Sequence, residues 1–340
     1  MSIANQPTFS ATPYITPSNW RSTAEILVTL SLLFIGLWGI QLTLTGGHWL
    51  FYALAIVPVG LLFTRVFVMV HDLTHRTLYK KGWVNDVVGS ILGVLVLTPF
   101  YLWRKVHLVH HKEGGNTDKR PWLGDLNVQT VREYQARTPL NKFRYRLYRN
   151  PFIMFCLGSI YVFMVDQRRS KKSTPEHPVF GRKERLSVIG TNIAILVFFG
   201  AITAWMGVKF LVMAMLIPLW LSGIMGIYLF YVQHNFRNKY FVPNTEWNLR
   251  DSAVKGSSFH DIPSILMWLT ANIGYHHVHT LSTRIPFYRL PSCHHNETLF
   301  EETPRVTLRD LPTVLSYKLY DEDKKEMITW REYKERFTAQ

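Results

Sequence analysis

The chain has 340 residues, 48% of them hydrophobic, and its 38 Lys and Arg against 23 Asp and Glu give a net charge of +15. Only two cysteines are present, Cys156 and Cys293, which excludes a disulfide-rich scaffold and a zinc or iron–sulfur site with four cysteine ligands. Fourteen histidines indicate that any bound metal is held by nitrogen.

Four long apolar segments are predicted to cross a membrane, because a spanning helix needs about 20 mostly apolar residues. In chain order they are residues 26–44, 49–70, 187–206 and 210–232. The short connections between them, residues 45–48 and 207–209, predict two helical hairpins. The alternative, four buried helices of one soluble domain, is disfavoured because a soluble domain rarely has so many apolar runs of this length.

Basic residues are concentrated on one side of these spans: at the start of the chain, in residues 104–150 and 167–186, and from Arg237 onward. Because Lys/Arg-rich loops stay in the cytoplasm, we expect both termini and the active site to be cytoplasmic. The membrane is the inner or plasma membrane if the protein is bacterial. The charge of +15 then reflects orientation and attraction to anionic lipid, and the sequence has no motif that favours nucleic acid.

Two shorter apolar segments, residues 84–103 and 151–165, have cytoplasmic features on both flanks, so each is predicted to lie in the membrane interface. The predicted fold is therefore all-α and integral to the membrane, with four transmembrane helices, two interfacial helices and a cytoplasmic cap. We expect a mobile cytoplasmic N-terminal tail (residues 1–24), a membrane domain (residues 25–300) and a cytoplasmic C-terminal tail (residues 301–340). Residues 319–337 mix acids and bases and predict a solvated surface helix.

Histidines gather at the predicted cytoplasmic ends of the apolar segments, in groups spaced by three or four residues. Residues with this spacing share one face of a helix, and several such faces together could surround two metal ions. The candidate ligands are His71, His75, His107, His110, His111, His234, His276 and His279. Imidazole ligands without thiolate suit iron, zinc, copper or nickel.

The other histidines fit this pattern less well. His48, His177 and His260 have no spaced partner, and His277 lies off the face shared by its neighbours, so they are interpreted as ordinary histidines. His294 and His295 follow a turn at Pro291 and are kept as alternative ligands.

The spaced motifs HDLTH, HLVHH and HHVHT resemble the three histidine boxes of the integral-membrane fatty acid desaturases and related hydroxylases. The segment FYVQHNF resembles the additional histidine of that family, here His234. The segments NDVVGSILGVLVLTPFYLWRKVH, RYRLYRNPFIMF and GSSFHDIPSILMWLTANIGYHHVH are similar to the bacterial acyl-lipid branch. The likeness covers about residues 50–310.

The resemblance implies an O2-dependent enzyme that introduces a cis double bond into a lipid-linked acyl chain at two non-haem Fe2+ ions. A hydroxylase on the same fold is the alternative. The eight candidate histidines would hold the iron, and Asp72 and Asp118 would accept hydrogen bonds from ligand imidazoles. Because the chain has no dinucleotide motif and no haem domain, electrons would come from a separate donor of the ferredoxin or cytochrome b5 type.

Basic residues around the second histidine box have two interpretations. Arg104, Lys105, Lys119 and Arg120 could bind a lipid head group, or they could simply mark the cytoplasmic side.

Two positions depart from the family pattern. The third box of the family ends in two adjacent histidines, whereas here His279 is followed by Thr280. A hydroxyl is a far poorer iron ligand than imidazole, so one iron would lack a nitrogen ligand unless water, His294 or His295 compensates. This departure also leaves open a metal-depleted relative without catalytic activity. The second departure is Arg237, where close relatives are expected to have an acidic residue.

Overall fold

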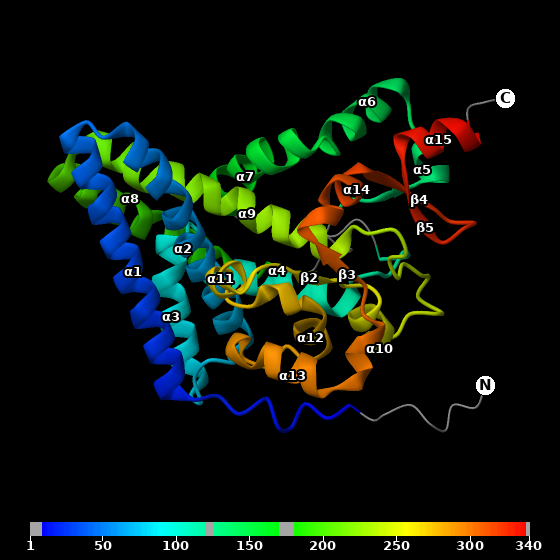
Figure 1. Cartoon of the computed structure of the whole chain (residues 1–340), viewed down its shortest axis with the longest axis horizontal. Helices are drawn as coiled ribbons and strands as arrows, with labels where there is room; N and C mark the ends of the chain where they lie inside the picture. The colour runs from blue at the N-terminus through cyan, green and yellow to red at the C-terminus, as the bar shows by residue number, and fades with distance from the viewer. Residues whose placement is uncertain (1–8, 120–125, 170–179, 338–340) are drawn as a thin grey trace.

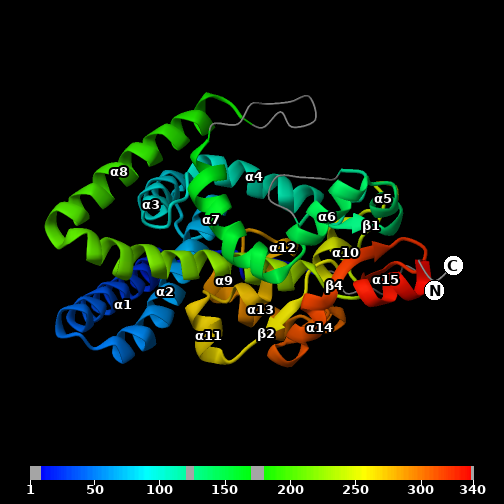
Figure 2. The same ribbon diagram turned by 90° about the horizontal axis from the view of Figure 1, so that it is seen from above.

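The computed structural model describes residues 9–119, 126–169 and 180–337, and Arg120 and His177 lie outside them. The fold is mostly helical (Figure 1). Four long helices form one side of the molecule: α1 (Asn19–Gly46), α2 (Trp49–His75), α8 (Arg182–Phe210) and α9 (Ile217–His234). Short helices and two small sheets form the other side (Figure 2).

Each pair of long helices is joined by a tight connection that contains a glycine in the left-handed region. Gly47 (φ 71°) ends α1, and its N–H donates to the carbonyl of Thr43. Gly207 (φ 82°) interrupts α8, and the chain reverses direction near it before the π-helical turn Leu211–Leu216 leads into α9 (Figure 2). Both reversals lie on the side of the molecule away from the short helices, as the predicted hairpins require.

Several helices are suited to a membrane by length and composition. In the described part of the chain, three helical stretches qualify: Asn19–Gly46, Trp49–His75 and Arg182–His234, the last of which contains two of the predicted spans. The number rises to as many as five if each of two bent helix pairs makes one span. Their outward side chains are apolar and exposed; for example, Phe34 is 67% exposed and Leu196 is 75% exposed. Such side chains are suited to contact with lipid.

Each of the two segments predicted to be interfacial belongs to a bent pair of helices. Residues 84–103 are divided between α3 (Gly82–Leu95) and α4 (Phe100–Glu113), which meet at 103°. The break follows from Pro99, because a proline disfavours helical backbone in the residue before it. The second segment meets α6 (Pro139–Tyr148) at 76° and consists of π-helical turns around the short α7 (Gly158–Ile160), from Ile153 to Val165.

Five short strands in the described residues correct the prediction of an all-α fold. β1 (Gln129–Thr130) pairs in parallel with β4 (Tyr317–Asp321), which pairs antiparallel with β5 (Glu326–Thr329). β2 (Phe259–Asp261) pairs in parallel with β3 (Arg305–Thr307). The remaining short helices are α5 (Val131–Gln135), α10 (Leu249–Val254), α11 (Ser264–Leu269), α12 (His276–Leu281), α13 (Leu290–Asn296), α14 (Leu311–Ser316) and α15 (Trp330–Phe337).

The C-terminal segment was predicted to be one surface helix, and this prediction is wrong. Residues 319–337 form most of the β4–β5 hairpin and then α15, because Asp321 Oδ1 accepts hydrogen bonds from the N–H groups of Asp323 and Lys324 and closes a turn. Leu319 and Ile328 are fully buried in a small core. Arg237 also holds this segment, since its guanidinium lies 2.9 Å from carboxylate oxygens of both Glu326 and Glu332.

The sequence predicts a mobile N-terminal tail, but its described residues pack against Tyr288 and Glu297. Tyr14 is 8% exposed, and its hydroxyl donates to Glu297 Oε1 at 3.0 Å. The backbone N–H of Ser18 donates to the hydroxyl of Tyr288 at 3.0 Å. Helix α1 then begins at Asn19, several residues before the predicted span.

A buried ion pair joins α1, α2 and α11. Arg65 is 1% exposed, and its Nη2 lies 2.6 Å from Glu25 Oε2. Its Nε donates to Thr29 Oγ1 at 3.0 Å, and its Nη1 donates to the carbonyl of Trp268. The guanidinium carbon lies 4.0 Å from the centre of the Trp268 ring. This single cation therefore connects the first two long helices to α11.

Glu25→Gln is expected to destabilise the protein, because it leaves the Arg65 cation buried without a counter-charge. We expect the free energy of unfolding to fall by about 3 kcal/mol. Thermal unfolding in detergent measures the change. Arg21→Gln is the matched control, because Arg21 Nε lies 3.9 Å from Glu25 in an exposed pair, which contributes at most about 1 kcal/mol. Equal melting temperatures for the two variants would show that the Arg65 pair does not stabilise the fold.

Candidate metal centre

A first group of five histidines gathers where α2, α4 and α12 meet. It contains His71, His75, His107, His111 and His279, each of which has a ring nitrogen within 4.8 Å of one on every other member. His71 and His75 lie on one face of α2, and His107 and His111 lie on one face of α4, as their spacing predicts. Helix α12 contributes His279.

A second group of three histidines lies beside the first. His110 comes from α4, His234 from the last residue of α9 and His276 from the first residue of α12, and their ring nitrogens also lie within 4.8 Å of one another. All three are buried. Thus α4 and α12 each contribute to both groups, and all eight histidines predicted from the sequence fall into one group or the other.

The nitrogen positions fit metal ions. The Nε2 atoms of His107 and His111 are 2.8 Å apart, and those of His111 and His279 are 3.1 Å apart. In the second group, the Nε2 atoms of His234 and His276 are 3.1 Å apart. Two nitrogen ligands at a right angle, each about 2.1 Å from a metal, would lie about 3 Å apart.

Burial favours the form of imidazole that binds a metal. The Nε2 atoms of His71 and His75 are buried without a hydrogen-bond partner. Burial, reinforced by neighbouring imidazoles, lowers the pKa of His276 and of His279 well below the ordinary histidine value. The rings of His276 and His279 are therefore neutral at physiological pH, and neutral imidazole is the ligand form.

The two carboxylates predicted to support the ligands differ in their contacts. Asp72 is 1% exposed; its Oδ1 lies 3.1 Å from His71 Nδ1, and its Oδ2 accepts the N–H of Phe287 at 2.7 Å. This contact leaves His71 Nε2 for the metal. Asp118 accepts hydrogen bonds from Thr117 Oγ1 and from the N–H of Asn244. Neither bond involves an imidazole, so Asp118 joins two loops and does not have the predicted contact.

Asp72→Asn is expected to weaken metal binding and activity by about 10- to 100-fold, the usual cost of losing a carboxylate that orients a ligand imidazole. The amide has nearly the same shape as the carboxylate, so the change removes mainly the charge. Metal content of the purified protein and the rate of product formation are the measurements. Asp118→Asn is the control, and equal losses in both variants would contradict the role of Asp72.

The remaining described histidines lie outside both groups. His260 lies 2.9 Å from the Tyr228 hydroxyl and 2.9 Å from the Val306 carbonyl, and it joins β2 to α9 and β3. His294 Nδ1 lies 2.9 Å from His277 Nε2, and His295 Nε2 lies 3.5 Å from the Tyr275 hydroxyl. His294 and His295 therefore belong to a separate cluster, and the spacing of residues along the chain does not predict the His277–His294 pair.

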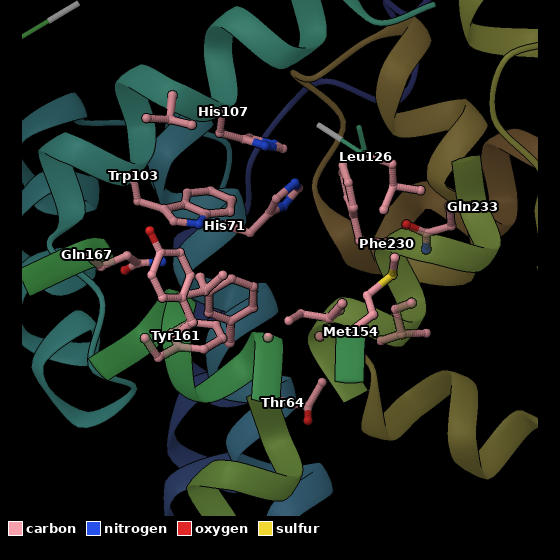
Figure 3. A pocket seen from close by; sticks show the side chains of 18 of the residues that line it. Thr64, His71, Trp103, His107, Leu126, Met154, Tyr161, Gln167, Phe230 and Gln233 are labelled. Atoms are coloured by element: carbon pink, nitrogen blue, oxygen red, sulfur yellow. The ribbon is translucent and has the colours of Figure 1, made fainter. Parts of the chain in front are cut away.

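An apolar cavity of about 590 Å³ lies against the histidine groups. His71 and His107 of the first group and His276 of the second group line it. Figure 3 shows His71 and His107 at one side, and Thr64 of α2 at the opposite end. Trp103, Phe230 and Gln233 also line the cavity, and no motif in the sequence marks these three residues.

The basic residues near the second box are partly neutralised. Arg104 Nη1 lies 3.2 Å from Asp86 Oδ1, and Arg76 makes two hydrogen bonds to the same carboxylate. Lys119 lies 3.8 Å from Glu113. Arg104 thus has a protein partner, which weakens its interpretation as a lipid-phosphate ligand.

Apolar helices able to cross a membrane, together with buried imidazole groups beside an apolar cavity, define a membrane-type protein with a histidine-rich centre. The family model for fatty acid desaturases matches residues 47–309. The chain is 38% identical over 330 residues to a fatty acid desaturase of Bacillus subtilis, an alignment that covers 97% of this chain and 91% of the relative.

Two other relatives have more specific names. The sn-1 oleoyl-lipid 12-desaturase of Synechocystis is 28% identical over 284 residues, which is 81% of this chain and 75% of the relative. The sn-1 acyl-lipid omega-3 desaturase (ferredoxin) of Nostoc is 24% identical over 252 residues, which is 71% of this chain and 66% of the relative. The chain therefore belongs to the fatty acid desaturase family, and it is a lipid desaturase and an oxidoreductase.

Proposed function

We propose that this desaturase introduces a cis double bond into the acyl chain of a membrane lipid, with two non-haem Fe2+ ions and O2. The observation that carries the proposal is the pair of buried imidazole groups beside the apolar cavity. The five histidines of the first group would hold one iron and the three of the second group would hold the other. When bound, the iron supplies the activation of O2 that removes two hydrogens from an unactivated chain.

The chain's own residues then position the substrate. The cavity follows one face of α2 from Thr64 to His71 and one face of α9 from Gly226 to Gln233. An acyl chain along these faces would bring one of its carbons beside His71 and His107. The walls are mostly apolar, so they exclude water from the reacting carbons and hold the chain by the hydrophobic effect.

The cavity opens toward the membrane side of the protein in this proposal. Leu157 and Tyr161 line the cavity and are also 53% and 56% exposed, so they mark its mouth. Both belong to the bent segment Ile153–Val165, whose outer side chains are largely apolar. An acyl chain that is still attached to a bilayer lipid can enter here without passing through water. The names of the Synechocystis and Nostoc relatives, which act on acyl lipids, support this substrate class.

We further propose a multi-pass topology with four spans and two interfacial segments, and with both termini and the metal centre in the cytoplasm. The tails at 1–24 and 301–340 would flank a membrane domain at 25–300. Two observations support this orientation: the basic residues outside the spans, and the separation of the two helix reversals from the histidine groups. The membrane is the inner or plasma membrane in a bacterium.

A separate electron donor is part of the proposal. The printed name of the Nostoc relative includes ferredoxin, which supports a donor of that type, and cytochrome b5 is the alternative. The net charge of +15 suits an acidic donor.

Expression in a host without a comparable desaturase, followed by mass spectrometry of its lipids, tests the function. We expect unsaturated acyl chains that are lighter than their precursors by two hydrogens. Acyl chains heavier by one oxygen would instead indicate the hydroxylase, which the names of the relatives do not favour. Unchanged lipids in cells that contain metal-loaded protein and a working donor would indicate a non-catalytic relative.

A further inference from the structure

The departure at Thr280 affects one of the two histidine groups specifically. Thr280 lies four residues after His276 on α12, so these two residues share a helix face. His276 belongs to the second group, whereas His279 points to the first. A histidine at position 280 would therefore face the second group, which has only three imidazoles against five in the first.

A small cavity lies at this point. Its volume is about 10 Å³, and its walls include Thr280, Ser257, His110 and His234. That volume is about the space needed for a single water molecule. The hydroxyl oxygens of Thr280 and Ser257 lie 3.4 Å apart, and the two residues are 9% and 1% exposed. A water there would lie beside both hydroxyls and beside His110 and His234 of the second group.

The wall opposite α12 is held rigidly. The backbone of Gly256 hydrogen-bonds the ring of His234, and a Cβ at position 256 would lie 2.3 Å from the carbonyl oxygen of Ser252. Only glycine fits this close approach. The next residues fix the segment further, because Ser258 hydrogen-bonds to the carbonyls of Gln233 and Val232. Ser257 is therefore held at a defined position beside the cavity.

We propose that Thr280 and Ser257 position a water molecule in this cavity as the fourth ligand of the second metal, in place of the family's histidine. The inference rests on the proposed function, because it requires a metal in each group. His294 and His295 do not replace the ligand, since they lie with His277 and Tyr275. The second metal is then held by three imidazoles and a water, so it binds more weakly than the first. The buried Lys239 also lines the cavity, and its positive charge further opposes a second cation.

Metal titration of the purified full-length protein tests this inference without relying on activity. Metal-free protein in detergent is titrated with Fe2+, or with Co2+ for its visible spectrum, against a competing chelator. We expect two binding steps whose dissociation constants differ by about 10-fold or more. Thr280→Val removes the hydroxyl but keeps the shape, so it should weaken only the second step, by about 10-fold. Thr280→Ser keeps the hydroxyl and should bind like the parent.

Thr280→His is the complementary variant. An imidazole at this position should tighten the second step, leave the first step unchanged and alter the Co2+ spectrum of the second equivalent only. Because imidazole is larger than the cavity, this result is interpreted together with the Val and Ser variants, which preserve the packing. Ser257→Ala should also weaken the second step, since it likewise removes one of the two hydroxyls that hold the water.

The outcomes separate this inference from the proposed function. If two metals bind in the parent and Thr280→Val binds both equally well, the water ligand is wrong and the desaturase centre stands. If only one metal binds in the parent and in Thr280→Ser, the inference is overturned because the second group holds no metal. If no metal binds under any condition, the proposed function fails as well.

Discussion

His107→Ala is expected to abolish desaturation while membrane insertion stays intact. His107 Nε2 lies 2.8 Å from His111 Nε2 in the first histidine group, and the ring also lines the substrate cavity. Losing a residue that orients a ligand costs about 10- to 100-fold, and losing the ligand itself should cost more than about 100-fold. The apolar helices are unchanged, so the protein should still enter the membrane.

Lipid profiling of cells that express the variant in place of the parent measures the loss, and membrane fractionation measures insertion. The metal content should fall because the variant loses the first, tighter binding step. His48→Ala is the matched control, because His48 is an exposed histidine in the connection between α1 and α2. Normal lipid unsaturation with His107→Ala would contradict the assignment of His107 as a ligand.

The histidine site could be predicted from the sequence because its information is local. Ligands spaced by three or four residues share a helix face wherever that helix lies, so His71 with His75 and His107 with His111 needed no tertiary structure. The division of the histidines into two groups, by contrast, required the tertiary structure. His110 and His111 are neighbours in sequence but belong to different groups, and only the meeting of α4 with α9 and α12 separates them.

Contacts between segments that are distant in sequence explain which predictions were wrong. Asp72 and Asp118 are both acidic residues near a histidine box, but only Asp72 contacts an imidazole, and nothing local distinguishes them. Residues 319–337 have helix-compatible charges, yet the chain forms β4 and β5 because Leu319 and Ile328 find a small core supplied by residues 131–145. Such tertiary packing overrides local preference.

The substrate cavity shows the same limit and leads to the second large prediction. Gly226, Phe230 and Gln233 lie on one face of α9 and line the cavity, but in sequence they are part of an ordinary apolar span. The structure distinguishes the two nearby glycines of this helix. A Cβ at Gly223 would lie 3.0 Å from Ser159 Cβ, whereas a Cβ at Gly226 would have no other atom within 4 Å. Gly226 therefore leaves room for substrate, and Gly223 allows close helix packing.

Gly226→Leu is expected to fill part of the cavity and block long acyl chains without unfolding the protein. Gly226 lies eight residues before His234, which is about 12 Å along the helix, so the added side chain is far from this ligand. We expect desaturation of the longest accepted chains to fall by about 10-fold or more, with a shift toward shorter ones.

Gly200→Leu on α8 is the matched control, because a Cβ there also has no atom within 4 Å, and Gly200 does not line the cavity. Metal content and melting temperature should match the parent in both variants, and an unchanged chain-length profile with Gly226→Leu would show that the acyl chain lies elsewhere.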